Sequence, residues 1–294
     1  AYADTFNAIQ LMTPLALALG ANSPTLFCHR LWQETRIPLF KQSIDTRHLD
    51  RYGWNEPARV SFGQGWARRD ATELFREVVR LYPPLLPICA ERSPAREIAD
   101  GMTPSLGELR LHQSTVWLWN RPIYDDADGG MLRIEMRALP AGPTPVDMVA
   151  NAAFLIGLAE GIRPRINELL PAIPFPIAEY NFYRAAQYGL DAKLVWPGFA
   201  QSGYREQAIS DVIEASLPLA RDGLARVGID GAEAARYLGV IEQRLACRRT
   251  GASWQLERLA QLGRSMPTTS ALRDLLEEFM AYSEANTPVA EWPL

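Results

Sequence analysis

Lysine, cysteine and histidine are all scarce in this 294-residue chain. Lys41 and Lys193 are the only lysines, so arginine supplies nearly all of the 30 basic side chains. A planar guanidinium binds carboxylate and phosphate oxygens in a bidentate manner, which suits oxyanion recognition. The cysteines, Cys28, Cys89 and Cys247, are odd in number and widely spaced. This spacing argues against a disulfide framework or a zinc site and favours a reducing cytoplasm.

Several sequence motifs are also missing. There is no GxxxxGK[ST] phosphate loop, no GxGxxG after a strand and no GxSxG elbow. The three histidines have no close metal-ligand spacing. The apolar stretch 11–19 contains a proline and is too short to span a bilayer. The net charge of −4 gives no support for nucleic-acid binding. We therefore expect a cytoplasmic protein that binds neither nucleic acid nor membrane.

Helical spacing of apolar residues dominates both ends of the chain. A chain of this length can form one large domain or two closely packed ones. Asp4 and Ser253 are predicted helix N-caps, and Pro38 interrupts the second predicted helix. The predicted helices cover residues 4–19, 30–46, 70–81, 146–170, 177–188, 205–226, 231–246, 253–263 and 269–285.

The middle of the chain has the alternation typical of strands. Residues 109–118 and 131–137 are predicted to pair as an antiparallel hairpin across a turn at 125–130, and a short strand is expected at 59–62. The prediction is an α+β fold, with a small antiparallel sheet region over residues 1–145 that contains the Asn-Ser-Pro turn and the Arg-Glu-Arg strand. A helical region over 146–294 is expected to pack on that sheet within one continuous domain.

The most informative stretch is the predicted strand Met131–Arg137. Strand side chains alternate, so Arg133, Glu135 and Arg137 share one face. Such a row is costly to bury, and it should face either water or a polar ligand. A carboxylate between two guanidiniums could hold a divalent cation while its neighbours bind phosphate or carboxylate oxygens. The alternative is an exposed strand face with self-paired charges.

A second candidate lies near the first predicted turn. Asn22 and Ser23 precede a proline, and Trp32 and Arg36 are expected on one face of the following helix. Arg36 could bind a carboxylate or phosphate, and the turn could add neutral hydrogen bonds. Alternatively, the turn is only a turn and the helix is solvated.

Two further segments carry arginine. Arg121 follows the predicted strand and could add a third guanidinium to the Arg-Glu-Arg row, although terminal arginines often point to solvent. Trp117 and Trp119 are more often core residues than ligand platforms. Residues 248–255 begin with an arginine pair, and the helix start at Ser253 could bind an anion or be an ordinary loop.

Together these segments resemble glutamate–cysteine ligase family 2, the carboxylate–amine ligases related in fold to glutamine synthetase. The resemblance covers roughly residues 4–263. It depends on the order of the segments Leu17–Pro24, Trp32 with Arg36, Ser114–Trp117 with Arg121, Arg133–Arg137 and the late Gly-Ala-x-x-Gln at 251–255.

The resemblance implies an ATP- and Mg²⁺-dependent reaction. ATP would phosphorylate a substrate carboxylate, commonly that of glutamate, and an amine such as that of cysteine would attack the acyl phosphate to form an amide. The implied partners are these small molecules, and the chain could form a homo-oligomer. The implied roles are catalytic for Arg36, Arg121 and Arg137, substrate-binding for Asn22, Ser23 and Arg133, and metal-binding for Glu135.

The chain also departs from the family pattern. The Glu-x-Glu strand and the His-x-His strand expected before the Asn-Ser-Pro turn are missing, and Cys28 stands where glycine is usual. Glu135 alone cannot supply the several carboxylates of a magnesium cluster. We therefore expect the chain to be the C-terminal part of a ligase. Two alternatives are a non-catalytic binding homologue that has lost the metal-binding strand and an unrelated helical protein with surface charge pairs.

Overall fold

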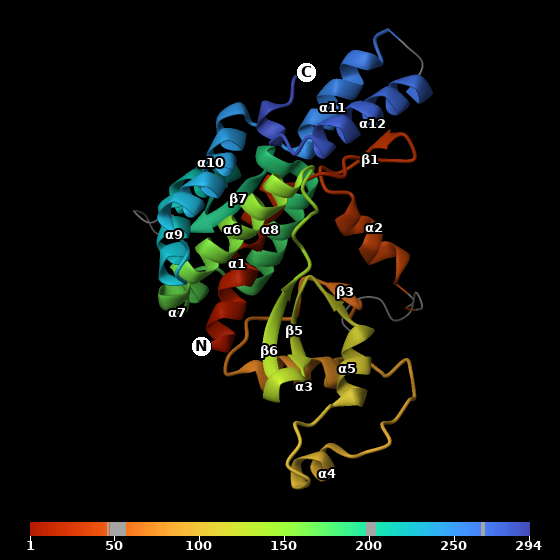
Figure 1. Cartoon of the computed structure of the whole chain (residues 1–294), viewed down its shortest axis with the longest axis vertical. Coiled ribbons are helices and arrows are strands. Elements are labelled where there is room, and N and C mark those ends of the chain that lie inside the picture. The colour runs from red at the N-terminus through yellow and green to blue at the C-terminus, as the bar shows by residue number, and fades with distance from the viewer. Residues whose placement is uncertain (46, 48–56, 198–203, 266–267) are drawn as a thin grey trace. The chain divides into compact units, whose positions relative to one another are not determined.

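The computed structural model describes residues 1–45, 47, 57–197, 204–265 and 268–294. His48 and residues 52–56 of the loop before the first predicted strand lie outside the described residues. The chain divides into two compact units, which Figure 1 draws and which are described separately below. Unit 1 consists of 1–6 and 38–137, and unit 2 of 7–37 and 138–294. The predicted boundary near residue 145, between a sheet region and a helical region, stays a prediction.

Among its described residues, unit 1 contains short strands, most of helix α2 (Arg36–Ser43) and helices α3 to α5. β5 and β6 form the antiparallel hairpin that is visible in Figure 1. β3 pairs in parallel with β4. The strands and α-helices that lie wholly in unit 1 are β3 (Val60–Ser61), α3 (Ala71–Leu81), α4 (Pro94–Ala99), α5 (Gly107–Ser114), β4 (Trp117–Leu118), β5 (Asn120–Asp125) and β6 (Met131–Met136).

The predicted strand over 109–118 is wrong for most of its length. Gly107–Ser114 forms helix α5, and only Trp117 and Leu118 are extended in β4. This segment is rich in Glu, Leu, Arg and Gln, which are good helix formers. Leu109 and Leu111 lie two residues apart, and two apolar positions alone do not distinguish the helical period of 3.6 residues from the strand period of two. The predicted hairpin exists, but the partner of β6 is β5, which begins after the predicted strand.

Unit 2 is mainly helical. Most of helix α1 (Tyr2–Gly20) belongs to unit 2, and Asp4 lies in its first turn and is not its N-cap. Helix α2 (Arg36–Ser43), of which only Arg36 and Ile37 belong to unit 2, starts six residues later than predicted. The later helices are α6 (Pro145–Ile162), α7 (Ile166–Leu169), α8 (Phe175–Tyr188), α9 (Ile209–Arg226), α10 (Gly231–Cys247), α11 (Gly251–Leu262) and α12 (Thr268–Glu284).

Two antiparallel hairpins in unit 2 were not predicted. The first joins β1 (Thr25–Leu26) to β2 (His29–Arg30), and the second joins β7 (Lys193–Pro197) to β8 (Tyr204–Ala208). The Arg-Glu-Gln-Ala run of β8 favours a helix locally, but its backbone pairs with β7 instead. Tertiary pairing therefore overrides propensity at the start of the predicted helix 205–226.

Helices α6 and α9 approach each other closely because glycine lines their contact. A Cβ on Gly157 would lie 2.4 Å from the carbonyl oxygen of Ala220, and one on Gly223 would lie 1.8 Å from the carbonyl oxygen of Gly157. Only glycine allows backbones to come so near. Figure 1 shows the two helices side by side.

The segment Pro145–Ala172 is long and apolar enough that its composition alone would also suit a membrane span. About half of its most apolar window (44%) is buried inside the structure, as in a core helix. Composition therefore does not distinguish the two possibilities here.

The fold is a helix-rich α+β arrangement, as predicted. The predicted single antiparallel sheet is not what the described residues form: they form four two-stranded ladders, of which β3–β4 is parallel. The finer prediction, a sheet of the glutamine synthetase type, stays a prediction.

Candidate functional site

The β5–β6 hairpin of unit 1 brings three predicted residues together. Arg121 lies directly opposite Glu135 in the register of the hairpin. Its Nε donates to Oε2 of Glu135 at 2.5 Å, and Nε of Arg137 lies 3.5 Å from the same oxygen. One carboxylate oxygen therefore lies between two guanidiniums, on the face that strand alternation predicts.

Both guanidiniums are held by further contacts. Nη1 of Arg121 donates to the carbonyl oxygens of Gln113 (3.3 Å) and Val116 (3.4 Å). Nη1 of Arg137 donates to the carbonyl oxygen of Leu118 at 3.1 Å, and its guanidinium lies 5.6 Å from the ring centre of Phe40. These contacts fix both side chains, so their positive charges are presented in a defined geometry.

The third arginine of the row has a different partner. Arg133 pairs with Asp125 at 2.7 Å and its side chain is 58% exposed. Asp125 was not predicted as a site residue. It is the last residue of β5 and lies on the same face of this strand as Arg121. Arg133 and Arg121 line a cleft of about 160 Å³ together with Arg110, Gln113 and Ser114. Three guanidiniums around one small cleft suit a carboxylate or phosphate ligand, and such a ligand competes for Arg133 with Asp125, which lines the same cleft.

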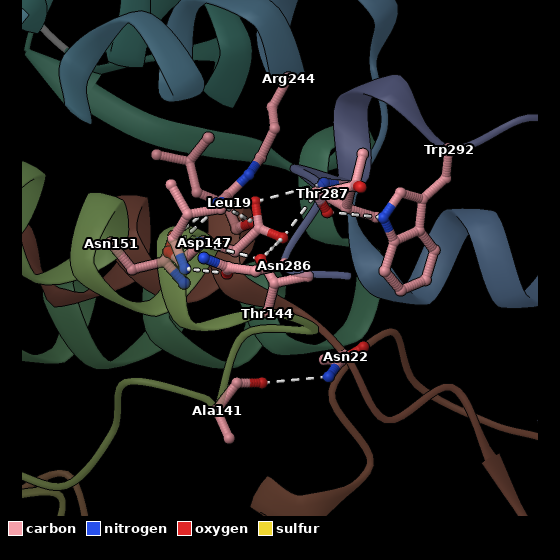
Figure 2. Close-up of polar contacts among 12 residues, drawn as sticks. Leu19, Asn22, Ala141, Thr144, Asp147, Asn151, Arg244, Asn286, Thr287 and Trp292 are labelled. Carbon is pink, nitrogen blue, oxygen red and sulfur yellow. Dashed lines mark hydrogen bonds and ion pairs between the residues drawn. The ribbon is translucent and has the colours of Figure 1, made fainter. Parts of the chain in front are cut away.

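In unit 2 the Asn22 side chain joins three segments of the chain. Its Nδ2 donates to the carbonyl oxygen of Ala141 at 3.1 Å, the contact drawn in Figure 2. Nε2 of Gln255 donates to both the backbone oxygen and Oδ1 of Asn22, each at 3.0 Å. The early Asn-Ser-Pro turn and the late Gly-Ala-x-x-Gln segment therefore meet, although more than 200 residues separate them.

Arg36 and Ser23 lie next to that turn. Oγ of Ser23 accepts a hydrogen bond from the backbone N–H of Arg36 at 3.2 Å. Nη2 of Arg36 donates to the carbonyl oxygen of Ala138 at 2.8 Å. Trp32 precedes α2, so the prediction that Trp32 and Arg36 share a helix face is wrong. The structure places Asn22, Ser23 and Arg36 in unit 2 and the other four predicted residues in unit 1.

Glu34 is a residue that the sequence analysis missed. Its buried carboxylate accepts from Nε of Arg36 at 3.0 Å and from the backbone N–H of Asn22 at 2.9 Å. The signal in the sequence was a carboxylate two residues before an arginine, in a stretch predicted as an ordinary helix. Glu34 therefore fixes Arg36 against the Asn-Ser-Pro turn.

The helix that contains the late segment begins differently from the prediction. Thr250, not Ser253, is the N-cap of α11: its Oγ1 accepts from the backbone N–H of Ser253 at 3.1 Å, and Oγ of Ser253 accepts from the backbone N–H of Thr250 at 2.9 Å. Nη2 of Arg248 pairs with Asp191 at 2.6 Å, and Arg249 donates to the carbonyl oxygen of Trp292. Both arginines of this segment therefore have partners within the protein.

A buried ion pair in unit 2 was also missed. Figure 2 shows Arg244 directed at Asp147 and Asn151. Its Nη2 lies 2.7 Å from Oδ1 of Asp147, and its Nη1 donates to Oδ1 of Asn151 at 2.5 Å. Burial lowers the pKa of Arg244, and Asp147 opposes this shift. Asp147 also accepts from Oγ1 of Thr144 and from the backbone N–H of Val289. This cluster ties α6 and α10 to the C-terminal segment and is structural.

The contacts at the hairpin and at the Asn-Ser-Pro turn agree with the segments on which the family resemblance depends. A family model described as Glutamate-cysteine ligase family 2 matches residues 3–278. The chain belongs to this family. The predicted resemblance is confirmed over nearly the whole sequence. No curated protein matches the chain.

Membership of glutamate–cysteine ligase family 2 indicates a carboxylate–amine ligase that acts on small molecules. The residues present do not make a magnesium site by themselves. Oε2 of Glu135 is occupied by two guanidiniums, whose positive charges oppose a nearby cation. Over the described ranges, no group of three or more His, Cys, Asp or Glu side chains could hold a metal. Magnesium requires several oxygen ligands, so Glu135 and its described neighbours do not fit this ion.

Proposed function

We propose that the protein is an ATP-dependent, ADP-forming carboxylate–amine ligase, with the β5–β6 hairpin as part of its anion-binding site. Membership of glutamate–cysteine ligase family 2 carries this proposal. The geometry of Arg121, Glu135 and Arg137 supports it, since fixed guanidiniums are suited to transferred phosphoryl groups.

The reaction proceeds in two balanced steps. A carboxylate oxygen of glutamate, or of a similar acid, attacks the γ-phosphorus of ATP, which gives an acyl phosphate and ADP. The amine of cysteine or a similar compound then attacks the acyl carbon, inorganic phosphate leaves, and the amine nitrogen loses a proton. Both steps concentrate negative charge on phosphate oxygens, which cations stabilise.

The arginines of unit 1 have distinct roles in this proposal. Arg121 and Arg137 neutralise phosphate charge, and Glu135 orients both guanidiniums. Arg133 lies at the exposed end of the 160 Å³ cleft, where it binds the second carboxylate of the acid. Glu135 as a metal ligand stays a prediction of the sequence.

In unit 2, Arg36 is proposed to bind an anion while Glu34 fixes its orientation. Asn22 and Ser23 shape the backbone on which Arg36 is held. A cytoplasmic location and a homo-oligomeric state belong to the proposal as well.

Trapping of the acyl phosphate tests the proposal. The protein as it occurs in its source is incubated with ATP, Mg²⁺, glutamate and hydroxylamine, and the hydroxamate and ADP are quantified. We expect equal amounts of both, and none of either without glutamate. If ADP and hydroxamate both fail to form with glutamate and with a panel of other carboxylic acids, the ligase proposal is wrong.

The alternative is a binding homologue without catalysis. It is favoured by one observation, the lack of a carboxylate cluster among the described residues. It predicts that Glu135→Ala behaves as the wild type does in every binding measurement. A Mg²⁺-dependent gain in ATP affinity that Glu135→Ala abolishes would exclude this alternative.

A further inference from the structure

Unit 1 contains a second cleft, of about 400 Å³, on the side of α5 that bears Glu108 and His112. Residues of α3, of the segment 83–90 and of α5 line it, and none of them has a role in the ligase proposal. Its volume lies within the range of small-molecule sites. We define it as the α3–α5 cleft.

The walls of the α3–α5 cleft are apolar. Val79, Leu86, Ile88 and Leu109 contribute hydrocarbon side chains. Val79, Leu86 and Ile88 are exposed to solvent, and Ile88 is 63% exposed. Large apolar side chains that stay in water around a concave surface favour a ligand with an apolar body.

The cleft has a single charged side chain at its rim. Among the described residues that line it, Glu108 is the only acidic one, and none is lysine or arginine. Oε1 of Glu108 accepts the backbone N–H of Ala90 at 2.8 Å, which lowers the pKa of this carboxyl. Glu108 forms no ion pair with another described residue, so its negative charge is not neutralised by the protein.

The second polar group is also an acceptor. Nε2 of His112 lies 3.2 Å from the carbonyl oxygen of Val78. A carbonyl only accepts, so Nε2 carries a proton, and in the tautomer with this one ring proton Nδ1 has a lone pair. Within the described part of the chain, this buried Nδ1 has no hydrogen-bond partner. Neither Glu108 nor Nδ1 of His112 is therefore paired with a cationic side chain of the described residues.

We propose that the α3–α5 cleft binds an organic ammonium compound whose apolar body lies against Val79, Ile88 and Leu109 and whose cationic nitrogen pairs with Glu108. An apolar wall with only acceptors at its polar end is complementary to a protonated amine, and it disfavours carboxylates. This site is separate from the arginine cleft of the hairpin, and its existence does not rest on the ligase proposal.

Calorimetric titration tests the inference with two probes of nearly the same shape. Phenethylamine is cationic at neutral pH, and 2-phenylethanol is neutral. We expect the wild-type protein to bind the amine roughly fivefold more tightly than the alcohol, because only the amine can form an exposed ion pair with Glu108. Equal affinities, or no amine binding at millimolar concentration, would overturn the proposal.

Three variants sharpen the test. Glu108→Gln keeps an oxygen that can accept from Ala90, and it should abolish the preference for the amine. Glu91→Gln removes a neighbouring charge that does not line the cleft, and it should keep the preference. Ile88→Ala should weaken the binding of both probes because it removes apolar wall. A preference that persists in Glu108→Gln contradicts the proposal even if both probes bind.

A separate measurement decides whether the ammonium compound in the α3–α5 cleft is the amine substrate of the ligase or a ligand that is not consumed. If phenethylamine is incorporated into an amide when ATP and glutamate are present, the cleft receives the amine substrate. If it binds without incorporation while hydroxylamine still traps the acyl phosphate, the cleft holds a ligand that is not consumed. Binding is measured without ATP, so failure of the ligase reaction leaves the binding result intact.

Discussion

Gly251 and Asn22 lie so close that a Cβ on Gly251 would be 2.0 Å from Oδ1 of Asn22. The Asn22 side chain cannot move away freely, because Ala141 and Gln255 hold its amide from two sides. The glycine at the start of α11 is therefore required by the Asn-Ser-Pro turn, and not by the backbone conformation of α11.

Gly251→Ala is expected to destabilise the protein by about 1–3 kcal/mol, since the new methyl group overlaps the Asn22 amide. Gly239→Ala, in the interior of α10, is the matched control. No atom lies within 4 Å of a Cβ there, so alanine should stabilise the helix by roughly 0.5–1 kcal/mol. Chemical denaturation of both variants measures the two effects, and equal shifts would contradict the role assigned to Gly251.

The residues that meet at this turn could be found in the sequence, but their contact could not. Asn22, Ser23 and the segment at 251–255 were all identified by type and order. Their hydrogen bonds join segments more than 200 residues apart, and short-range spacing carries no information about such pairs. Glu34 was missed for the same reason, since its role depends on the backbone of Asn22 and not on its neighbours in a helix.

The β5–β6 hairpin shows what the alternation of side chains along a strand can and cannot predict. Period two placed Arg133 and Glu135 on one face, because both lie in β6. Arg137 follows the last residue of β6, and its Nε lies 3.5 Å from Oε2 of Glu135. The strand that pairs with β6 was predicted about ten residues too early in the chain. The segment that contains α5 and β4 is rich in residues that suit both a helix and a strand. Arg121 was assigned to the right cluster even so, and the ion pair between Arg133 and Asp125 was not foreseen.

Breaking the buried ion pair between Arg244 and Asp147 should strongly destabilise the protein. Asp147→Ala is expected to reduce stability by about 3–5 kcal/mol, because it leaves Arg244 buried without its countercharge. Arg221→Ala removes a surface pair with Glu242 and should change stability by less than about 1 kcal/mol. Both values come from the same denaturation experiment. A small loss for Asp147→Ala would show that Arg244 reaches water in the folded protein.

Glu77 should make stability depend on pH. Burial raises the pKa of its carboxyl above the ordinary value of 4.5, and Glu73 adds to this shift while Arg68 opposes it. The folded state therefore binds the proton more tightly than the unfolded state does. The resulting stability is fully present below the ordinary pKa and is lost as pH rises through the folded pKa.

Glu77→Gln is accordingly expected to stabilise the protein at pH 7 and to have less effect below pH 4.5. Glu214→Gln, on the exposed side of α9, serves as the control and should show a smaller difference between the two pH values. Thermal unfolding at several pH values measures this. A stabilisation by Glu77→Gln that does not change with pH would refute the assigned cause.

Arg121→Lys tests the hairpin as a catalytic element. Lysine keeps the charge but loses the planar fork, so it cannot hold Glu135 and a phosphate oxygen in the same geometry. We expect hydroxamate formation to fall on the order of a hundredfold, as for the loss of one fixed transition-state donor. Arg165→Lys, at an exposed pair with Glu168 in unit 2, is the control and should retain full activity. Because the side chain of Arg121 is only 18% exposed, thermal unfolding of the variant must show an intact fold before the rates are compared. A folded Arg121→Lys protein with the rate of the wild type would remove Arg121 from the reaction and leave the Arg121–Glu135 pair with a structural role.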